Sequence, residues 1–217
     1  MTSLAHPAPH LGAAVRRPSR AATSLRKRAF DIAVAGLALI AFLPLLAIIG
    51  MAIWMESPGP VLFRQQRSGL GGRPFRIFKF RTMSVVEDGG DLVQAVRGDR
   101  RVTPLGAILR HLSLDELPQL LNVLRGEMSI VGPRPHALAH DMLWSRSTPG
   151  YAGRFRARPG LTGAAQVQGL RGEVTGDAGL AARIAADNAY IDDWTFAGDL
   201  RLVARTIPVL LGDAQAF

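Results

Sequence analysis

The stretch AFDIAVAGLALIAFLPLLAIIGMAIWM, from Ala29 to Met55, decides the fold of this chain. It is almost wholly apolar, interrupted by one acidic residue, two glycines and one proline. A helix needs about 20 apolar residues to cross a bilayer, so this stretch is long enough. Pro44 stands in its middle, where it removes a backbone hydrogen bond and crowds the preceding turn, so we expect a bend there.

The charges on both sides of this stretch bear on its path. Arg26, Lys27 and Arg28 precede it, and six basic residues follow it between residues 64 and 81. A single transmembrane anchor is the simple interpretation, but it would place one basic flank outside, against the positive-inside rule. A helix that enters, bends at Pro44 and returns to the same face satisfies both flanks. Asp31 would then stay at the interface, paired with Arg28.

The composition points to a membrane surface. Of the 217 residues 48% are hydrophobic, and the net charge is +9 with a pI of about 11.3. Residues 1–25 read as a mobile basic tail; Lys and Arg beside an apolar run meet anionic lipid, so we expect no nucleic-acid partner. The chain has no cysteine, which excludes disulfides and zinc–thiolate sites. Residues 26–217 are expected to form one domain.

The remaining pattern predicts an α+β fold: a bent membrane helix (29–55) and a small, mainly helical catalytic part (56–217) with short strands and amphipathic helices at the interface. The last helix is basic and amphipathic, which suits a membrane surface or a packed core equally. We expect strands at 61–64, 75–80 and 164–167, helices at 103–112, 114–124, 180–194 and 200–211, a surface loop at 87–101 and an irregular segment at 144–152.

The stretch RHLSLDELPQLLNVLRGEMSIVGPRP, from Arg110 to Pro135, is the most informative about chemistry. Asp115 and Glu116 stand at an expected helix start. One interpretation is capping, because Ser113 and Glu116 have the capping-box spacing and Asp115 could itself be the cap. In the other, an ionised aspartate lies beside helix N–H groups that also attract phosphate. Such a carboxylate can attack phosphorus, with a divalent ion drawing the pyrophosphate to it.

Four motifs together are similar to one known family. They are KRAFD (27–31), FKFRTM (78–83), the stretch that contains the acidic pair, and RPGLTGAAQVQG (158–169). In this order and spacing they resemble the bacterial sugar transferases, the monotopic phosphoglycosyl transferases that start polysaccharide assembly on polyprenyl phosphate. The resemblance covers residue 26 to the end. It implies a re-entrant membrane helix and a catalytic domain facing the cytoplasm at the bacterial inner membrane.

The resemblance also implies a reaction. Asp115 corresponds to the nucleophile and a contact of Mg²⁺, with Mn²⁺ as a substitute, and Glu116 is the second member of the pair. By a ping-pong route, Asp115 takes a sugar phosphate, expected to be galactose or glucose phosphate, from a UDP-sugar. UMP leaves, and undecaprenyl phosphate then attacks. Direct transfer in a ternary complex and an inactive scaffold for glycan assembly are the alternatives. The sequence leaves open whether the chain forms a homo-oligomer.

Five basic residues match positions implicated in phosphate contacts, and planar guanidinium groups fit phosphate oxygens well. For each, the alternative is a solvated surface charge, an alternative that is weakest for Arg134 because it stands between two prolines. The five are Arg81, its weaker neighbour Lys79, Arg110, Arg134 and Arg158.

Two departures from the family pattern stand out. Leu43 precedes Pro44 where many members have serine, which would bond a freed carbonyl and help to hold the bend. The extra multi-span N-terminal domain of larger relatives is not expected in this chain, which resembles the minimal form. No histidine spacing matches a metal motif, so we expect all five histidines to be non-catalytic.

Overall fold

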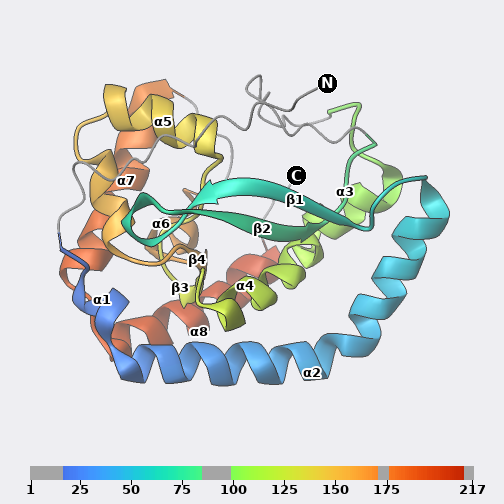
Figure 1. The fold of residues 1–217 in the computed structure, drawn as a ribbon, viewed down its shortest axis with the longest axis horizontal. Helices are drawn as coiled ribbons and strands as arrows, with labels where there is room; N and C mark the ends of the chain where they lie inside the picture. The colour runs from blue at the N-terminus through green and yellow to red at the C-terminus, as the bar shows by residue number, and fades with distance from the viewer. Residues whose placement is uncertain (1–16, 85–98, 171–175, 213–217) are drawn as a thin grey trace, which may run out of the picture.

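A computed structural model describes residues 17–84, 99–170 and 176–212. It is a mixed and mainly helical fold with two small sheets, as predicted (Figure 1). The helices are α1 (Arg20–Thr23), α2 (Leu25–Glu56), α3 (Pro104–His111), α4 (Leu120–Arg125), α5 (Leu138–Ser147), α6 (Ala164–Val167), α7 (Gly176–Asp192) and α8 (Phe196–Gly212). The 3-10 segments are η2 (Leu70–Gly72), η3 (Leu114–Gln119) and η4 (Tyr151–Arg156), and the strands are β1 (Leu62–Ser68), β2 (Pro74–Phe80), β3 (Ser129–Val131) and β4 (Gly160–Thr162).

Helix α2 is the apolar stretch, and within the described residues it is the one helix long and apolar enough to cross a membrane. It contains Pro44, and Figure 1 shows it running along the lower edge of the molecule and then turning upward. Only 11% of its most apolar window is buried, which is unlike the core helix of a soluble protein. The helix turns along its length, while a bend at Pro44 itself and the return to the same membrane face stay predictions.

Each half of α2 packs on a different part of the domain. In the first half, Ala35 is fully buried in the main core, which also contains Ile77, Val123 and Val131. In the second half, Ile49 and Ile53 pack against Phe80 and Leu109. The side chains between and outside these contacts are large, apolar and exposed: Leu37, Ile40, Leu43, Ile48, Trp54 and Met55. Such an exposed apolar surface is unusual for a soluble protein and is typical of a membrane-contacting or protein-contacting face.

The strands predicted at 61–64 and 75–80 are present as β1 and β2, and they pair as an antiparallel hairpin with Leu62 opposite Phe80 and Ser68 opposite Pro74. Asn122 of α4 binds the outer edge of β2. Its side-chain oxygen accepts from the Phe78 N–H at 3.0 Å, and its amide donates to the Arg76 carbonyl at 2.7 Å. Because Asn122 is fully buried, these bonds fix α4, and the segment before it, to the hairpin.

The second sheet joins two turns that are distant in sequence. Parallel strands β3 and β4 pair Ser129 with Gly160, so the turns GPRP and RPGLTG lie against each other. A Cβ on Gly160 would lie 2.1 Å from the Gly132 nitrogen, and one on Gly163 would lie 2.2 Å from the Gly132 oxygen. These glycines are required because the two backbones touch.

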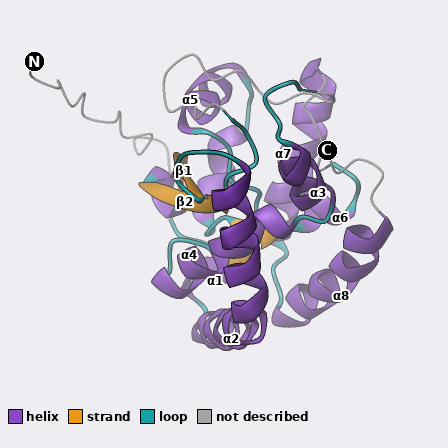
Figure 2. Cartoon of the chain, turned by 90° about the vertical axis from the view of Figure 1, so that its right-hand side faces the viewer, coloured by secondary structure: helices purple, strands orange, loops and turns teal. Residues whose placement is uncertain are grey.

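Several local predictions need correction. Part of the expected tail is ordered: Ser19 caps α1, and Ala21 is buried, so order begins before residue 26, while residues 1–16 lie outside the described part. The segment expected to be irregular includes the end of α5, and the expected strand at 164–167 is helix α6. Most of the loop predicted at 87–101 lies outside the described residues. Helices α3, α7 and α8 are confirmed, and Figure 2 shows α8 near α2 at the lower side, where Phe30 and Phe196 meet edge to face.

Candidate functional site

The acidic pair lies on η3, a tight 3-10 segment rather than the start of an α-helix. Ser113 has φ 57° and is the one non-glycine residue with positive φ in the described part of the chain. Its side chain makes no capping hydrogen bond, so the capping interpretation is wrong for Ser113. A left-handed serine costs about 1 kcal/mol or more, and such strain is concentrated at functional sites.

Glu116 is held by two cations. Arg134 grips both carboxylate oxygens, with Nη2 donating to Oε1 at 2.7 Å and Nη1 donating to Oε2 at 3.3 Å. Lys79 donates from Nζ to Oε1 at 2.9 Å. The GPRP turn and strand β2 thereby deliver the two predicted phosphate contacts Arg134 and Lys79 to the acidic pair.

Asp115 is buried beside this ion pair and is much less engaged. Its nearest cation is Lys79, with Nζ 4.0 Å from Oδ2, and among the described residues no side chain donates a hydrogen bond to it. Burial raises the pKa of Asp115, while Lys79, Arg110 and Arg134 oppose the rise and Glu116 adds to it. Arg110 is thus close enough to act on this carboxylate. Asp115 is left with free acceptor oxygens amid positive charge, which is the condition of a carboxylate that can take up a cation or attack an electrophile.

The donor set can be tested against a divalent ion. The described residues contain no cluster of three or more side chains that could enclose a metal. Mg²⁺ often binds through one or two protein carboxylates together with substrate phosphates and water. Asp115, with its free oxygens, fits this mode, so the site suits an ion that arrives with a diphosphate.

Two of the predicted phosphate contacts lie elsewhere. Arg81 is buried and closes the end of α2: its Nη1 donates to the Pro58 carbonyl at 2.6 Å and its Nη2 to the Ser57 carbonyl at 2.6 Å. Arg158 donates to the carbonyls of Gly126 at 2.9 Å and Ala22 at 2.8 Å. The structure brings neither residue to the acidic pair, because backbone carbonyls occupy both guanidinium groups.

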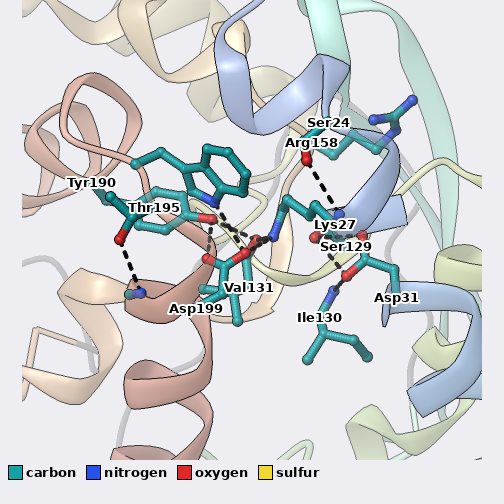
Figure 3. Close-up of polar contacts among 12 residues, drawn as sticks. Ser24, Lys27, Asp31, Ser129, Ile130, Val131, Arg158, Tyr190, Thr195 and Asp199 are labelled. Atoms are coloured by element: carbon teal, nitrogen blue, oxygen red, sulfur yellow. Dashed lines mark hydrogen bonds and ion pairs between the residues drawn. The ribbon is translucent and has the colours of Figure 1, made fainter. Parts of the chain in front are cut away.

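The charged residues of the KRAFD motif also make contacts inside the protein rather than with the acidic pair. Lys27 donates to Asp199 at 2.7 Å and to the Val131 carbonyl at 2.9 Å, and Asp31 accepts from the Ile130 N–H at 3.0 Å (Figure 3). Arg28 donates to the last carbonyls of α4. The expected Asp31–Arg28 pair is therefore wrong. These charges instead fix α2 to β3, immediately before the GPRP turn.

A buried polar network behind that turn was not predicted. Its members, which we call the turn network, are His136, Asp141, Tyr151, Arg154 and Asp187. They lie on four separate segments, and no local motif marks them. The signal that was available is the unusual number of arginines between residues 154 and 158.

A family model described as bacterial sugar transferase matches residues 22–213. The chain belongs to the bacterial sugar transferase family. The family predicted from the four motifs is confirmed, and with it the enzyme class, a sugar-phosphate transferase.

Individual relatives carry more specific names. The transferase is 57% identical to the UDP-glucose:undecaprenyl-phosphate glucose-1-phosphate transferase of Caulobacter vibrioides, over 91% of this chain and 74% of the relative. It is 45% identical to the protein of the same name from Escherichia coli, but spans 41% of that longer relative. It is 44% identical to the exopolysaccharide production protein PSS of Rhizobium leguminosarum, covering 88% of this chain and 98% of that one.

Proposed function

We propose that this chain transfers glucose 1-phosphate from UDP-glucose to undecaprenyl phosphate at the cytoplasmic face of the bacterial inner membrane, as a first membrane step of exopolysaccharide assembly. The names of the relatives support the glucose and the lipid. The observation that carries the chemistry is the unequal engagement of two adjacent carboxylates. Arg134 and Lys79 bind Glu116 directly, whereas the Asp115 carboxylate accepts no hydrogen bond from a described side chain and lies 4.0 Å from the Lys79 ammonium.

In the first half-reaction a carboxylate oxygen of Asp115 attacks the β-phosphorus of UDP-glucose. The bond from that phosphorus to the bridging oxygen breaks, and UMP leaves with the electron pair. An acyl phosphate between Asp115 and glucose phosphate remains. Arg134 and Lys79 lie where they can bind the diphosphate oxygens and the charge that grows on the leaving UMP.

In the second half-reaction a phosphate oxygen of undecaprenyl phosphate attacks the same phosphorus. The acyl–phosphate bond breaks, Asp115 is regenerated as a carboxylate, and undecaprenyl diphosphate glucose is formed. In the first half-reaction Asp115 would hold Mg²⁺, and the ion would neutralise charge between this carboxylate and the diphosphate of UDP-glucose. Glu116 serves in both steps by holding its two cations beside the reacting phosphorus.

The membrane arrangement fits this two-substrate cycle. The exposed apolar outer side of α2 suits insertion into lipid, and both halves of the helix pack on the domain that carries Asp115. A re-entrant path through one leaflet keeps the acidic pair at the interface. There, water-soluble UDP-glucose and the phosphate of a membrane lipid can reach the same carboxylate in turn.

The test is to trap the intermediate. The full-length chain in detergent is incubated with UDP-glucose and Mg²⁺ without lipid, quenched, and analysed by mass spectrometry of its peptides. We expect a glucose-phosphate adduct on Asp115 and one UMP per active site, and neither product from Asp115→Asn. Turnover that requires lipid and leaves no adduct would instead establish direct transfer in a ternary complex. No UMP release with any combination of substrates would favour the scaffold.

A further inference from the structure

The turn that carries Arg134 rests on the turn network. The network joins the residue after the turn (His136), helix α5 (Asp141), segment η4 (Tyr151 and Arg154) and helix α7 (Asp187). Their exposed fractions are between 1% and 7%. Burying several charged groups costs free energy unless each group is paired and hydrogen-bonded. A contribution to stability is therefore not a sufficient explanation for this network.

Arg154 is the centre of this network. Its Nε donates to Asp187 Oδ2 at 2.8 Å, and its Nη1 lies 2.9 Å from His136 Nδ1 and 3.2 Å from the Tyr151 hydroxyl. Its Nη2 donates to the backbone carbonyl of Arg134 at 2.5 Å. Because a guanidinium group is planar and rigid, these bonds fix the Arg134 carbonyl relative to α7 and η4.

The His136 ring is uncharged, which is compatible with its position beside the Arg154 guanidinium group. Burial lowers the pKa of His136 well below its usual value, and the guanidinium groups of Arg154, Arg183, Arg67 and Arg134 lower it further, so the ring is neutral at pH 7. A neutral ring can present Nδ1 as the acceptor for the Arg154 N–H. With Nδ1 as the acceptor, the 2.9 Å contact between Arg154 and His136 is a hydrogen bond on the C-terminal side of the turn.

Arg134 is thus fixed at both ends. Its side chain grips Glu116, and its backbone carbonyl is gripped by Arg154. The backbone next to it is held as well, because Arg67 Nη1 donates to the Pro135 carbonyl at 3.3 Å. A rotation of the turn would move the Arg134 guanidinium away from the acidic pair, and misplacement by about 1 Å can cost a rate factor of about 100.

We propose that Arg154 is a positioning residue of the transfer reaction: it holds the backbone of Arg134 so that the Arg134 guanidinium stays in reach of Glu116 and of the substrate diphosphate. The inference rests on the proposed function. It assigns a role in substrate binding to a buried arginine that touches neither the acidic pair nor the membrane helix.

A double-mutant cycle tests it with the full-length chain in detergent, with Mg²⁺ and undecaprenyl phosphate, by measuring UMP release against UDP-glucose concentration. Arg154→Lys keeps a positive charge for Asp187 but loses the planar fork. We expect it to lower kcat/KM about tenfold, mainly through KM, when Arg134 is present, and less than about twofold in an Arg134→Ala background. A merely structural residue would lower kcat/KM by the same factor in both backgrounds.

Arg156→Lys is the matched control, because Arg156 lies two residues further on η4 and pairs with Asp192, whose side chain is 56% exposed. Its kinetic constants should stay within about twofold of the wild type. If Arg154→Lys does not fold, Asp187→Asn, which removes the carboxylate that orients Arg154, replaces it in the cycle with the same expected coupling.

The outcomes separate the two proposals. Equal factors in both backgrounds, with wild-type turnover intact, would overturn the positioning role and leave the proposed function standing. No UMP release by the wild-type chain would overturn the proposed function itself.

Discussion

Two buried aspartates in this molecule, Asp199 and Asp115, differ in how many hydrogen bonds their carboxylate oxygens accept. Asp199 accepts from Lys27 at 2.7 Å, from the Tyr190 hydroxyl at 2.8 Å and from Trp194 Nε1 at 3.0 Å. Asp115, also buried, has its nearest cation at 4.0 Å. The hydrogen-bonded carboxylate of Asp199 stabilises the fold. The desolvated carboxylate of Asp115, whose oxygens accept no hydrogen bond from a described side chain, can bind or attack a substrate.

The largest effect should come from Asp115→Asn. The amide cannot form the acyl phosphate, so we expect UMP release to fall by about 10⁴-fold. The melting temperature should stay the same or rise, because the variant removes a desolvated charge. Thermal unfolding and UMP release of the same preparation check both expectations. A large loss of stability would mean that Asp115 belongs with the structural carboxylates.

The second-largest effect concerns Asp199, the aspartate that stabilises the fold. Lys27→Met leaves Asp199 buried without its cation, which should lower the free energy of unfolding by about 3 to 5 kcal/mol. Denaturant unfolding in detergent measures this. The double variant Lys27→Met/Asp199→Leu, which removes both charges, is the control and should recover most of the loss. No recovery would show that packing, rather than the uncompensated charge, is responsible.

Glu116→Gln should have a smaller effect than Asp115→Asn. The neutral amide grips Arg134 and Lys79 more weakly, but the nucleophile remains. We expect kcat/KM to fall by about 10- to 100-fold while the adduct on Asp115 still forms slowly. Single-turnover UMP release without lipid checks this. Complete loss of the adduct would give Glu116 a part in the bond-forming step itself.

The smallest effect is the pH dependence. Because burial raises the pKa of Asp115, the rate should fall as pH decreases through that raised value, by about tenfold per unit below it. Stability has the opposite sign: the folded state binds the proton more readily than the unfolded state, so the contribution of Asp115 to stability increases as pH falls. Comparing the stability of wild type with that of Asp115→Asn from pH 8 down to about 4, the ordinary pKa of aspartate, isolates this contribution, and identical profiles would contradict the raised pKa.

The sequence predicts local features of this molecule well and long-range contacts poorly. The apolar stretch with Pro44 and the two strands of the hairpin follow from short patterns, and the resemblance to the family points to Lys79 and Arg134 as residues of the site. The contacts of Arg81, Arg158 and the KRAFD motif do not follow from short patterns. The sequence around a basic residue is the same whether its side chain binds phosphate, lipid or a carbonyl about 100 residues away. Their partners depend on the tertiary fold, and so do those of Arg154.

Secondary structure failed where tertiary contacts override local preference. Gly163, which precedes helix α6, lies against the backbone of Gly132, and no short pattern around the predicted strand at 164–167 reveals this contact. The positive φ of Ser113 could not be predicted either, since serine rarely adopts that conformation without support from its surroundings.

Arg81 at the end of α2 has one further consequence. Lys79 and Arg81 are two residues apart, about 7 Å along an extended chain. Lys79 donates to Glu116, and Arg81 donates to the carbonyls of Ser57 and Pro58 immediately after the apolar helix, so the end of that helix and the acidic pair cannot shift independently. The short segment therefore acts as a spacer of fixed length between the end of the apolar helix and the acidic pair.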